Sequence, residues 1–213
     1  MITPWKSVTR PMALSLVSLF FVLLLAACGG GSSSTNTATP IPTVAPTPTP
    51  TVAPTQAAQF QIYKGAGFTI DYPQGWKAQT NQGAVVFTDA QQIDTVTIAT
   101  IPNPGGAVSA ADELKTGMSA LEQSGGVSNI QPVSLPATTT ISGESWAQSG
   151  ITGMAKVNGA LVPGELVGLA DNHPANLPTT KAYEIYYAGP SLNFQQTDIT
   201  IFQPMLQSFK FTA

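Results

Sequence analysis

Cysteine and histidine each occur only once in this chain of 213 residues, as Cys28 and His173. A single cysteine excludes any disulfide within the chain, so the folded part must depend on its packed core for stability. A single histidine excludes a two-histidine metal site within one chain. Any general base would have to be His173 or a carboxylate. The scarcity of cysteine and histidine therefore excludes intrachain disulfides and two-histidine metal sites.

Charge is also scarce, because only 9% of the residues are charged and the formal net charge is −3. An acidic balance provides no basic surface for nucleic acid, so we expect no nucleic-acid partner. Glycine and proline are abundant instead, with 19 and 18 residues. This composition is typical of an exported protein with turn-rich and linker segments.

The first 27 residues have the three parts of an export signal. Lys6 and Arg10 give a positive start, an apolar stretch follows over residues 12–25, and small residues precede Cys28. An uncleaved transmembrane anchor is the alternative, but it needs about 20 apolar residues. Residues 12–27 number only 16. The pattern therefore predicts a signal peptide over residues 1–27.

The four residues Leu25-Ala26-Ala27-Cys28 resemble the lipobox of bacterial lipoproteins. In that class the cysteine thiol is diacylated, with acyl groups such as palmitate, and the peptide is cut just before the cysteine. The resemblance implies lipidation at Cys28 and a protein anchored on the extracytoplasmic face of the cell membrane. Two acyl chains are needed for stable anchoring, because one chain gives only about 10⁴ M⁻¹ of membrane binding.

Residues 28–58 are expected to form a tether between the anchor and the folded part. Residues 29–34 are glycine and serine, and threonine then alternates with proline, as in residues 46–51. Such a segment favours extended polyproline II, at about 3.1 Å per residue, and forms no packed core. The sequence predicts a disordered tether. O-glycosylation of its threonines is a second possibility that the composition leaves open.

The remainder, residues 59–213, is expected to be one globular domain with strands on either side of a helix. Apolar and β-branched residues alternate at strand spacing. The strands expected are 68–72, 84–88, 95–101, 143–151, 153–157, 163–170, 182–188 and a short one within 208–212. A helix is expected from the cap Ser109 to Gly125-Gly126, with Leu114, Met118 and Leu121 on its buried face. Another is expected over residues 198–207, kinked or begun late because Pro204 lacks an N–H.

Three stretches resemble PsbP-like domains: residues 67–76 (GFTIDYPQGW), residues 183–187, and residues 202–211 (FQPMLQSFKF). The resemblance covers residues 59–213 and implies an α+β fold, an α/β/α sandwich around a central antiparallel sheet, shared by Mog-type proteins and several bacterial lipoproteins. The family's namesake is an extrinsic subunit that steadies the oxygen-evolving centre of photosystem II, where calcium retention matters. That role is the less favoured one here, since a lipid anchor and a Thr-Pro tether are not typical of it.

Catalytic signals are weak, and the sequence predicts neither an enzyme nor a bound metal or cofactor. Asp171 and His173 could contact one ion, but residues 171–174 are typical of an exposed turn. Gly143-Glu144-Ser145-Trp146-Ala147 approaches a Gly-x-Ser-x-Gly nucleophile elbow, which requires a following helix. The stretch after it is a poor helix former, so a hairpin turn at Gly143 is expected instead.

Two functions from different classes remain open. The first is a non-catalytic binding or scaffold module that contacts a protein partner or an envelope complex outside the membrane. The second is a carrier of a small apolar or lipid-like ligand, held in a cleft between sheet and helix. Aromatic residues are the weak candidates for contacting such a ligand, although most such residues are core residues: Trp76, Trp146, Tyr186 and Tyr187.

The lipid anchor can be tested at the only thiol. Replacing Cys28 by alanine (Cys28→Ala) removes the nucleophile, so we expect no incorporation of labelled fatty acid and an accumulated precursor of lower gel mobility. Ser33→Ala, five residues further on, is the matched control and should label normally. Continued labelling of the Cys28→Ala chain would contradict the lipobox interpretation.

Overall fold

The computed structural model describes residues 58–157 and 159–212, so the predicted signal peptide, Cys28 and nearly all of the predicted tether lie outside the described residues. The strands are β1 (Phe60–Lys64), β2 (Phe68–Pro73), β3 (Lys77–Asn81), β4 (Ala84–Thr88), β5 (Thr95–Pro102), β6 (Val127–Val133), β7 (Thr138–Ile141), β8 (Glu144–Val157), β9 (Ala160–His173), β10 (Lys181–Pro190) and β11 (Lys210–Phe211). The helical segments are η3 (Pro104–Gly106), α2 (Ala110–Gln123), α3 (Phe194–Thr197), η4 (Asp198–Phe202) and α4 (Gln203–Ser208).

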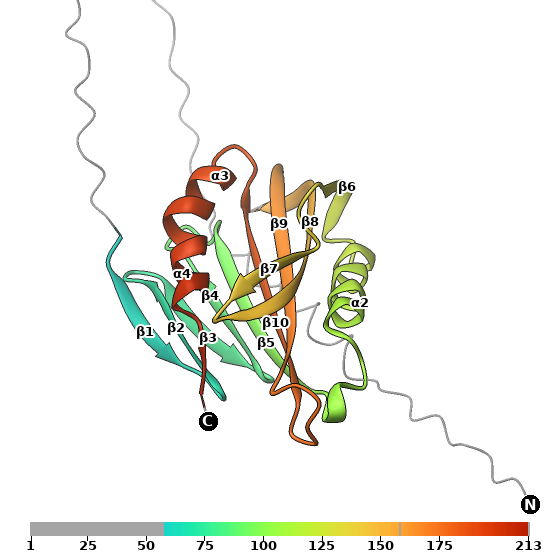
Figure 1. Ribbon diagram of the computed structural model, residues 1–213. Helices are drawn as coiled ribbons and strands as arrows, with labels where there is room; N and C mark the ends of the chain where they lie inside the picture. The colour runs from blue at the N-terminus through green and yellow to red at the C-terminus, as the bar shows by residue number, and fades with distance from the viewer. Residues whose placement is uncertain (1–57, 158, 213) are drawn as a thin grey trace, which may run out of the picture.

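An antiparallel sheet of eight strands forms the centre of the fold, in the order β3-β4-β5-β10-β9-β8-β6, with β7 paired to the start of β8. A smaller sheet has the order β1-β2-β11. Figure 1 shows α2 on one face of the central sheet and the C-terminal helical segment α3-η4-α4 on the other. The expected α+β sandwich around a central antiparallel sheet is therefore confirmed, with the small sheet as an additional element.

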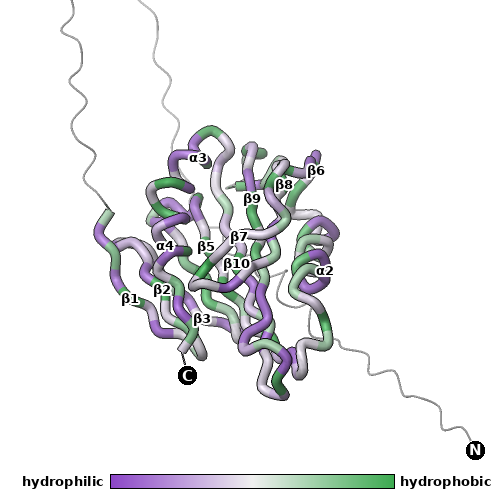
Figure 2. The backbone as a smooth tube through the Cα atoms, in the orientation of Figure 1, coloured by the Kyte–Doolittle hydropathy of each residue, from purple (hydrophilic) through white to green (hydrophobic). Residues whose placement is uncertain are grey.

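Two hydrophobic cores form because successive side chains of a strand point to opposite faces of the sheet. In β9, Val167 and Leu169 belong to a core shared with the C-terminal helical segment and the small sheet, which we call the C-terminal core. Their neighbours Leu166 and Ala170 belong to a second, smaller core under α2, which we call the α2 core. In Figure 2 the backbone tube is largely apolar in colour along the central strands and mixes hydrophilic and hydrophobic residues along the helices.

The predicted helix α2 is confirmed at both ends. The Ser109 hydroxyl accepts the Asp112 N–H at 3.1 Å, as an N-cap should. Gly125 follows the last turn with φ of 72°, a left-handed conformation that glycine adopts without strain. Leu114, Met118 and Leu121 are the buried residues of the helix, on the face that packs against the sheet.

Two predicted strands, 143–151 and 153–157, are wrong as separate elements, because β8 continues through Gly153. Gly153 lies opposite Gly164 in the β8–β9 register. A Cβ at residue 153 would overlap a methyl group of Val127 in β6. This glycine therefore permits close packing rather than ending the strand.

The C-terminal helix begins earlier than predicted, at Phe194, and widens to a π-turn over Asp198–Phe202. There the Gln203 N–H bonds to the Asp198 carbonyl, five residues back. Pro204 follows at once and has no N–H to continue the normal ladder, which explains the irregular turn before it. A late start caused by Pro204 and the predicted start at residue 198 are both wrong, and the irregularity next to Pro204 is a π-turn.

Four strands of the structure were not predicted from the sequence, namely β1, β3, β6 and β7. Their sequences are short or polar: FQIYK, KAQTN, VSNIQPV and TTTI. They carry few of the buried apolar residues that reveal a central strand, because β3 and β6 end the large sheet and β1 ends the small one.

Among residues 58–157 and 159–212, no helix is long and apolar enough to cross a membrane.

Gly117 provides a test of how α2 docks on the sheet. Alanine normally favours a helix over glycine by about 1 kcal/mol, but a Cβ at residue 117 would overlap the Tyr186 hydroxyl of β10. We therefore expect Gly117→Ala to lower the free energy of unfolding by about 1–3 kcal/mol. Adding Tyr186→Phe should restore part of the loss. The exposed Lys115→Ala is the control on the same helix. A stabilised Gly117→Ala chain, by denaturant unfolding, would contradict this packing.

Candidate functional site

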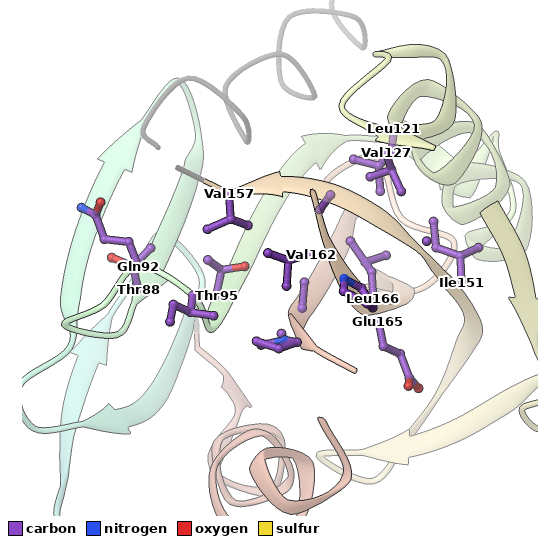
Figure 3. Close-up of a pocket in the computed structure, with 18 of the residues that line it drawn as sticks. Thr88, Gln92, Thr95, Leu121, Val127, Ile151, Val157, Val162, Glu165 and Leu166 are labelled. Atoms are coloured by element: carbon purple, nitrogen blue, oxygen red, sulfur yellow. The ribbon is translucent and has the colours of Figure 1, made fainter. Parts of the chain in front are cut away.

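An apolar groove lies on the α2 face of the central sheet, beyond the C-terminal end of α2. It has a volume of about 270 Å³. The helix covers only part of this face, so β4, β5 and the adjoining ends of β8, β9 and β10 are left to line the groove. The side chains along its middle, Val157 and Val162, come from β8 and β9 (Figure 3).

The end of the groove nearest α2 is entirely apolar. Four side chains form it, and Figure 3 shows them together on the side of the helix: Leu121, Val127, Ile151 and Leu166. Leu121 belongs to the buried face of α2, with only 5% of its surface exposed. The position of the helix therefore determines the shape of this end of the groove.

The opposite end of the groove carries uncharged polar side chains. Thr88 and Thr95 lie directly opposite each other in the β4–β5 register, and Gln92 extends from the turn between these strands (Figure 3). Gln79 of β3 lines the same end. Gln92 adopts φ of 58°, a left-handed conformation uncommon for a residue with a side chain. The groove is thus amphiphilic along its length.

Glu165 is the only ionisable residue that lines the groove in the described part of the chain. In Figure 3 its carboxyl group points away from the groove's other side chains. Burial raises the pKa of Glu165, and Asp198 of the C-terminal helical segment raises it further. Among the described residues that line the groove, no charged group therefore points into it.

The four aromatic residues predicted as weak ligand contacts do not line this groove. Trp146 is fully buried in the C-terminal core, and Trp76 packs against the same core. Tyr187 stacks on Phe194 at 6.0 Å between ring centroids. Tyr186 lies on the α2 side of the sheet. Three of them therefore pack in or against the C-terminal core, and no single surface contains all four.

A buried carboxyl group lies in the sheet where α2 packs on it. Glu184 of β10 is 7% exposed and accepts a hydrogen bond from the Tyr186 hydroxyl at 3.0 Å. Burial is the main cause that raises the pKa of Glu184 to about 7. The hydrogen bond from Tyr186 lowers this pKa by a smaller amount, and the negative charge of Glu113 on α2 raises it. The same burial raises the pKa of Tyr186, so its hydroxyl stays protonated and donating. Glycine at position 117 leaves room for this pair.

The prediction of an exposed turn at residues 171–174 is wrong for its first three residues. They continue β9, and Asp171 is buried with 9% of its surface exposed. The strand is held here by Asn172, whose side chain bonds Asn103 at 2.9 Å and the Val108 carbonyl at 2.9 Å. The sequence around residues 171–174 does not reveal that the strand continues here, because the hydrogen-bond partners of Asn172 lie more than 60 positions away in the chain.

Asp171, Glu144 and His173 form a small polar cluster at this end of the sheet. The His173 Nδ1 lies 2.8 Å from Glu144 Oε1, and the His173 ring stacks on Phe211 at 3.7 Å between centroids. Burial and a hydrogen bond to Glu144 raise the pKa of Asp171 to about 6. The groove does not include these residues, and no group of three or more His, Cys, Asp or Glu side chains among the described residues is arranged so that it could hold a metal ion.

The expected hairpin turn at Gly143 is confirmed. Ser142 and Gly143 connect β7 to β8 with φ of 55° and 80°, as a type I′ turn requires. The strand continues through Ser145, so the strand, sharp turn and helix of a nucleophile elbow are not formed here.

Comparison with known proteins gives matches only among solved structures. No family model and no curated protein matches the chain. Among solved structures it is similar to a protein of Bacteroides thetaiotaomicron, with 12% identity and a TM-score of 0.46 over 75% of this chain, and it spans 50% of that protein. It is also similar to LpqN of Mycobacterium tuberculosis, described as involved in cell envelope biogenesis, with 13% identity and a TM-score of 0.45. This match covers 73% of this chain and 91% of LpqN.

A mutant of the protein Mog1 is a third similar structure, with 9% identity, a TM-score of 0.44, and coverage of 71% of this chain and 95% of Mog1. The expected resemblance to Mog-type proteins is thus met among solved structures. At these identities and scores, the similarity assigns no activity or ligand to this chain.

Glu184 predicts a specific dependence of stability on pH. Its pKa of about 7 in the folded chain, against an ordinary 4.5, means that folding is favoured while the group is protonated. The contribution of protonated Glu184 to the free energy of unfolding is complete below pH 4.5. It is lost as the pH rises through 7, and the total loss is about 3 kcal/mol.

We expect the midpoint temperature of thermal unfolding to decrease as the pH is raised from 5 to 8. The decrease should be smaller in Glu184→Gln. The slope should not vanish, because Asp94 and Asp171 have raised pKa values of about 6 and act in the same direction. Glu122→Gln, at an exposed position of α2, is the control. Equal slopes in all three chains would contradict the assignment.

Proposed function

We propose that this chain is a lipid-anchored, non-catalytic binding protein outside the cell membrane, and that its folded domain holds a small apolar ligand. The single observation that carries the proposal is the groove on the open part of the α2 face. Its α2 end is lined by Leu121, Val127, Ile151 and Leu166. Concave, mostly apolar surfaces with a few polar groups are the usual form of a small-ligand site.

The size of the groove favours a small ligand over a segment of another protein. An apolar cavity of about 150 Å³ holds one benzene molecule, and the groove has about 270 Å³. An α-helix with its side chains is about 10–12 Å across, so only a few side chains from one face of a helix would enter this volume. A narrow chain or one or two rings fit it better.

The anchoring part of the proposal comes from Cys28 and the residues before it. LpqN, to which the chain is similar in structure, is described as involved in cell envelope biogenesis. A ligand taken from an envelope would reach the groove without crossing the cytoplasm, which fits a domain held close to a membrane by a tether.

The alternative of a protein scaffold has less support from the surface. The exposed large apolar side chains of the described residues belong to different elements: Ile62, Ile93, Leu161, Leu177, Leu192 and Ile199. Single exposed apolar residues are ordinary on soluble domains. A scaffold role stays a prediction from the sequence, and it becomes an outcome of the experiment below.

Photocrosslinking in living cells tests the proposal. A photoreactive leucine analogue would be incorporated into the full chain, and the adducts would be mapped on peptides by mass spectrometry. Leu121 and Leu166 line the groove, and Leu192, with 92% of its surface exposed, is the internal control. We expect a discrete small-molecule adduct at Leu121 and Leu166 that is absent from Leu192.

Variants that fill the groove should remove that adduct. At Gly164 an added Cβ would meet only the Gly189 carbonyl oxygen, at an ordinary 3.5 Å, so a side chain can begin here, and Gly164→Leu is chosen to fill the groove from β9. Ala155→Phe fills the groove from β8, and Ala66→Leu, exposed in the loop after β1, is the matched control. Adducts to another protein at the groove leucines, or none at all, would contradict the ligand-binding proposal.

A further inference from the structure

The two ends of the groove differ in chemistry, and this difference restricts the ligand beyond being apolar. The α2 end offers only hydrocarbon side chains, such as Ile151 and Leu166. The β4–β5 end offers two hydroxyl and two amide side chains. A ligand that satisfies both ends has an apolar part and a polar part joined end to end.

The polar end has hydrogen-bonding capacity that the protein itself does not use. The side chains of Thr88, Gln92 and Thr95 make no hydrogen bond to any other described residue, and neither does that of Gln79. Thr88, Gln92 and Thr95 are half-buried, so their access to water is reduced. A polar group of a ligand placed here would find several donors and acceptors within one small region.

The charges near this end do not favour an ionic group. Lys77 lies opposite Thr88 in the β3–β4 register, but it is exposed and does not line the groove. Asp89 follows Thr88 and accepts the backbone N–H groups of its own turn, at 2.6 Å from Ile93 and 3.1 Å from Asp94. Asp94, in the same turn, is a second carboxyl group beside this end, and neither Asp89 nor Asp94 lines the groove. Groups of both signs therefore flank this end without entering it. A net charge on the ligand would therefore gain little and lose its hydration.

We propose that the groove binds an uncharged single-chain lipid, with its hydrocarbon chain toward Leu121 and Leu166 and its hydroxyl-bearing end at Thr88 and Thr95. The proposal rests on the proposed function and deepens it by naming the ligand class and its orientation. A volume of about 270 Å³ admits one chain and not two. The source of the ligand is the surrounding membrane.

Three photoreactive probes test the charge of the polar end. Each has the same hydrocarbon chain with a diazirine near its tail, and they carry a hydroxyl, a carboxylate or a trimethylammonium group at the other end. The mature lipoprotein, anchored in phosphatidylcholine vesicles, is irradiated with each probe. Labelling of the peptides that contain Leu121 and Leu166 is counted after subtraction of the Ala155→Phe background.

We expect groove labelling by the hydroxyl probe to exceed labelling by either charged probe at least fivefold, the factor for one neutral hydrogen bond of about 1 kcal/mol. Replacing both hydroxyls in Thr88→Val/Thr95→Val should reduce labelling by the hydroxyl probe by at least the same factor. Thr100→Val removes a hydroxyl from β5 outside the groove and should change nothing. A second hydroxyl probe with its diazirine beside the polar end should label the peptide containing Thr88 and Thr95 instead.

The outcomes separate this inference from the proposed function. If the carboxylate or ammonium probe labels the groove as strongly as the hydroxyl probe, or if the two threonine replacements have no effect, the inference is wrong while a groove for apolar ligands stands. If no probe labels the groove above the Ala155→Phe background, both the inference and the proposed function are wrong.

Discussion

The register of three long antiparallel strands is the constraint on which the rest of this structure depends. β8 and β9 pair from Ala147 with Ala170 to Val157 with Ala160, and β10 pairs with β9 along its full length. Because side chains alternate between faces, a shift of one residue would exchange the two cores. The register therefore assigns Leu169 to the C-terminal core and Leu166 to the α2 core.

The two faces are then covered unequally, and the groove is the result. The C-terminal helical segment and the small sheet cover one face, whereas α2 alone packs on part of the other. The helix is held close by Gly117 over Tyr186, and its last apolar residue, Leu121, becomes a wall of the groove. Small residues at positions 155, 164 and 188 leave the space beyond α2 open. A change in how α2 docks would thus be transmitted directly to the site.

Much of this fold could be predicted from local pattern, but the site could not. The cap at Ser109, the stripe from Leu114 to Leu121 and the turn at Gly143 are local signals, and each formed as expected. The groove arises from β4, β5, β8, β9 and β10 together, and no single stretch of sequence carries a signal for it. The aromatic residues proposed from sequence are large and apolar, and for that reason Trp146 and Tyr187 became core residues. Threonine and valine, which line the groove, look like ordinary strand residues.

The central claim is that the open part of the α2 face holds a ligand. The most direct measurement is a crystal structure of this protein purified from the cells that make it, without detergent exchange. The account predicts one continuous, elongated feature of electron density from Leu166 to Thr95 that no protein atom explains. A groove containing only ordered water, or one closed by Leu121 and Val157 packed together, would contradict it.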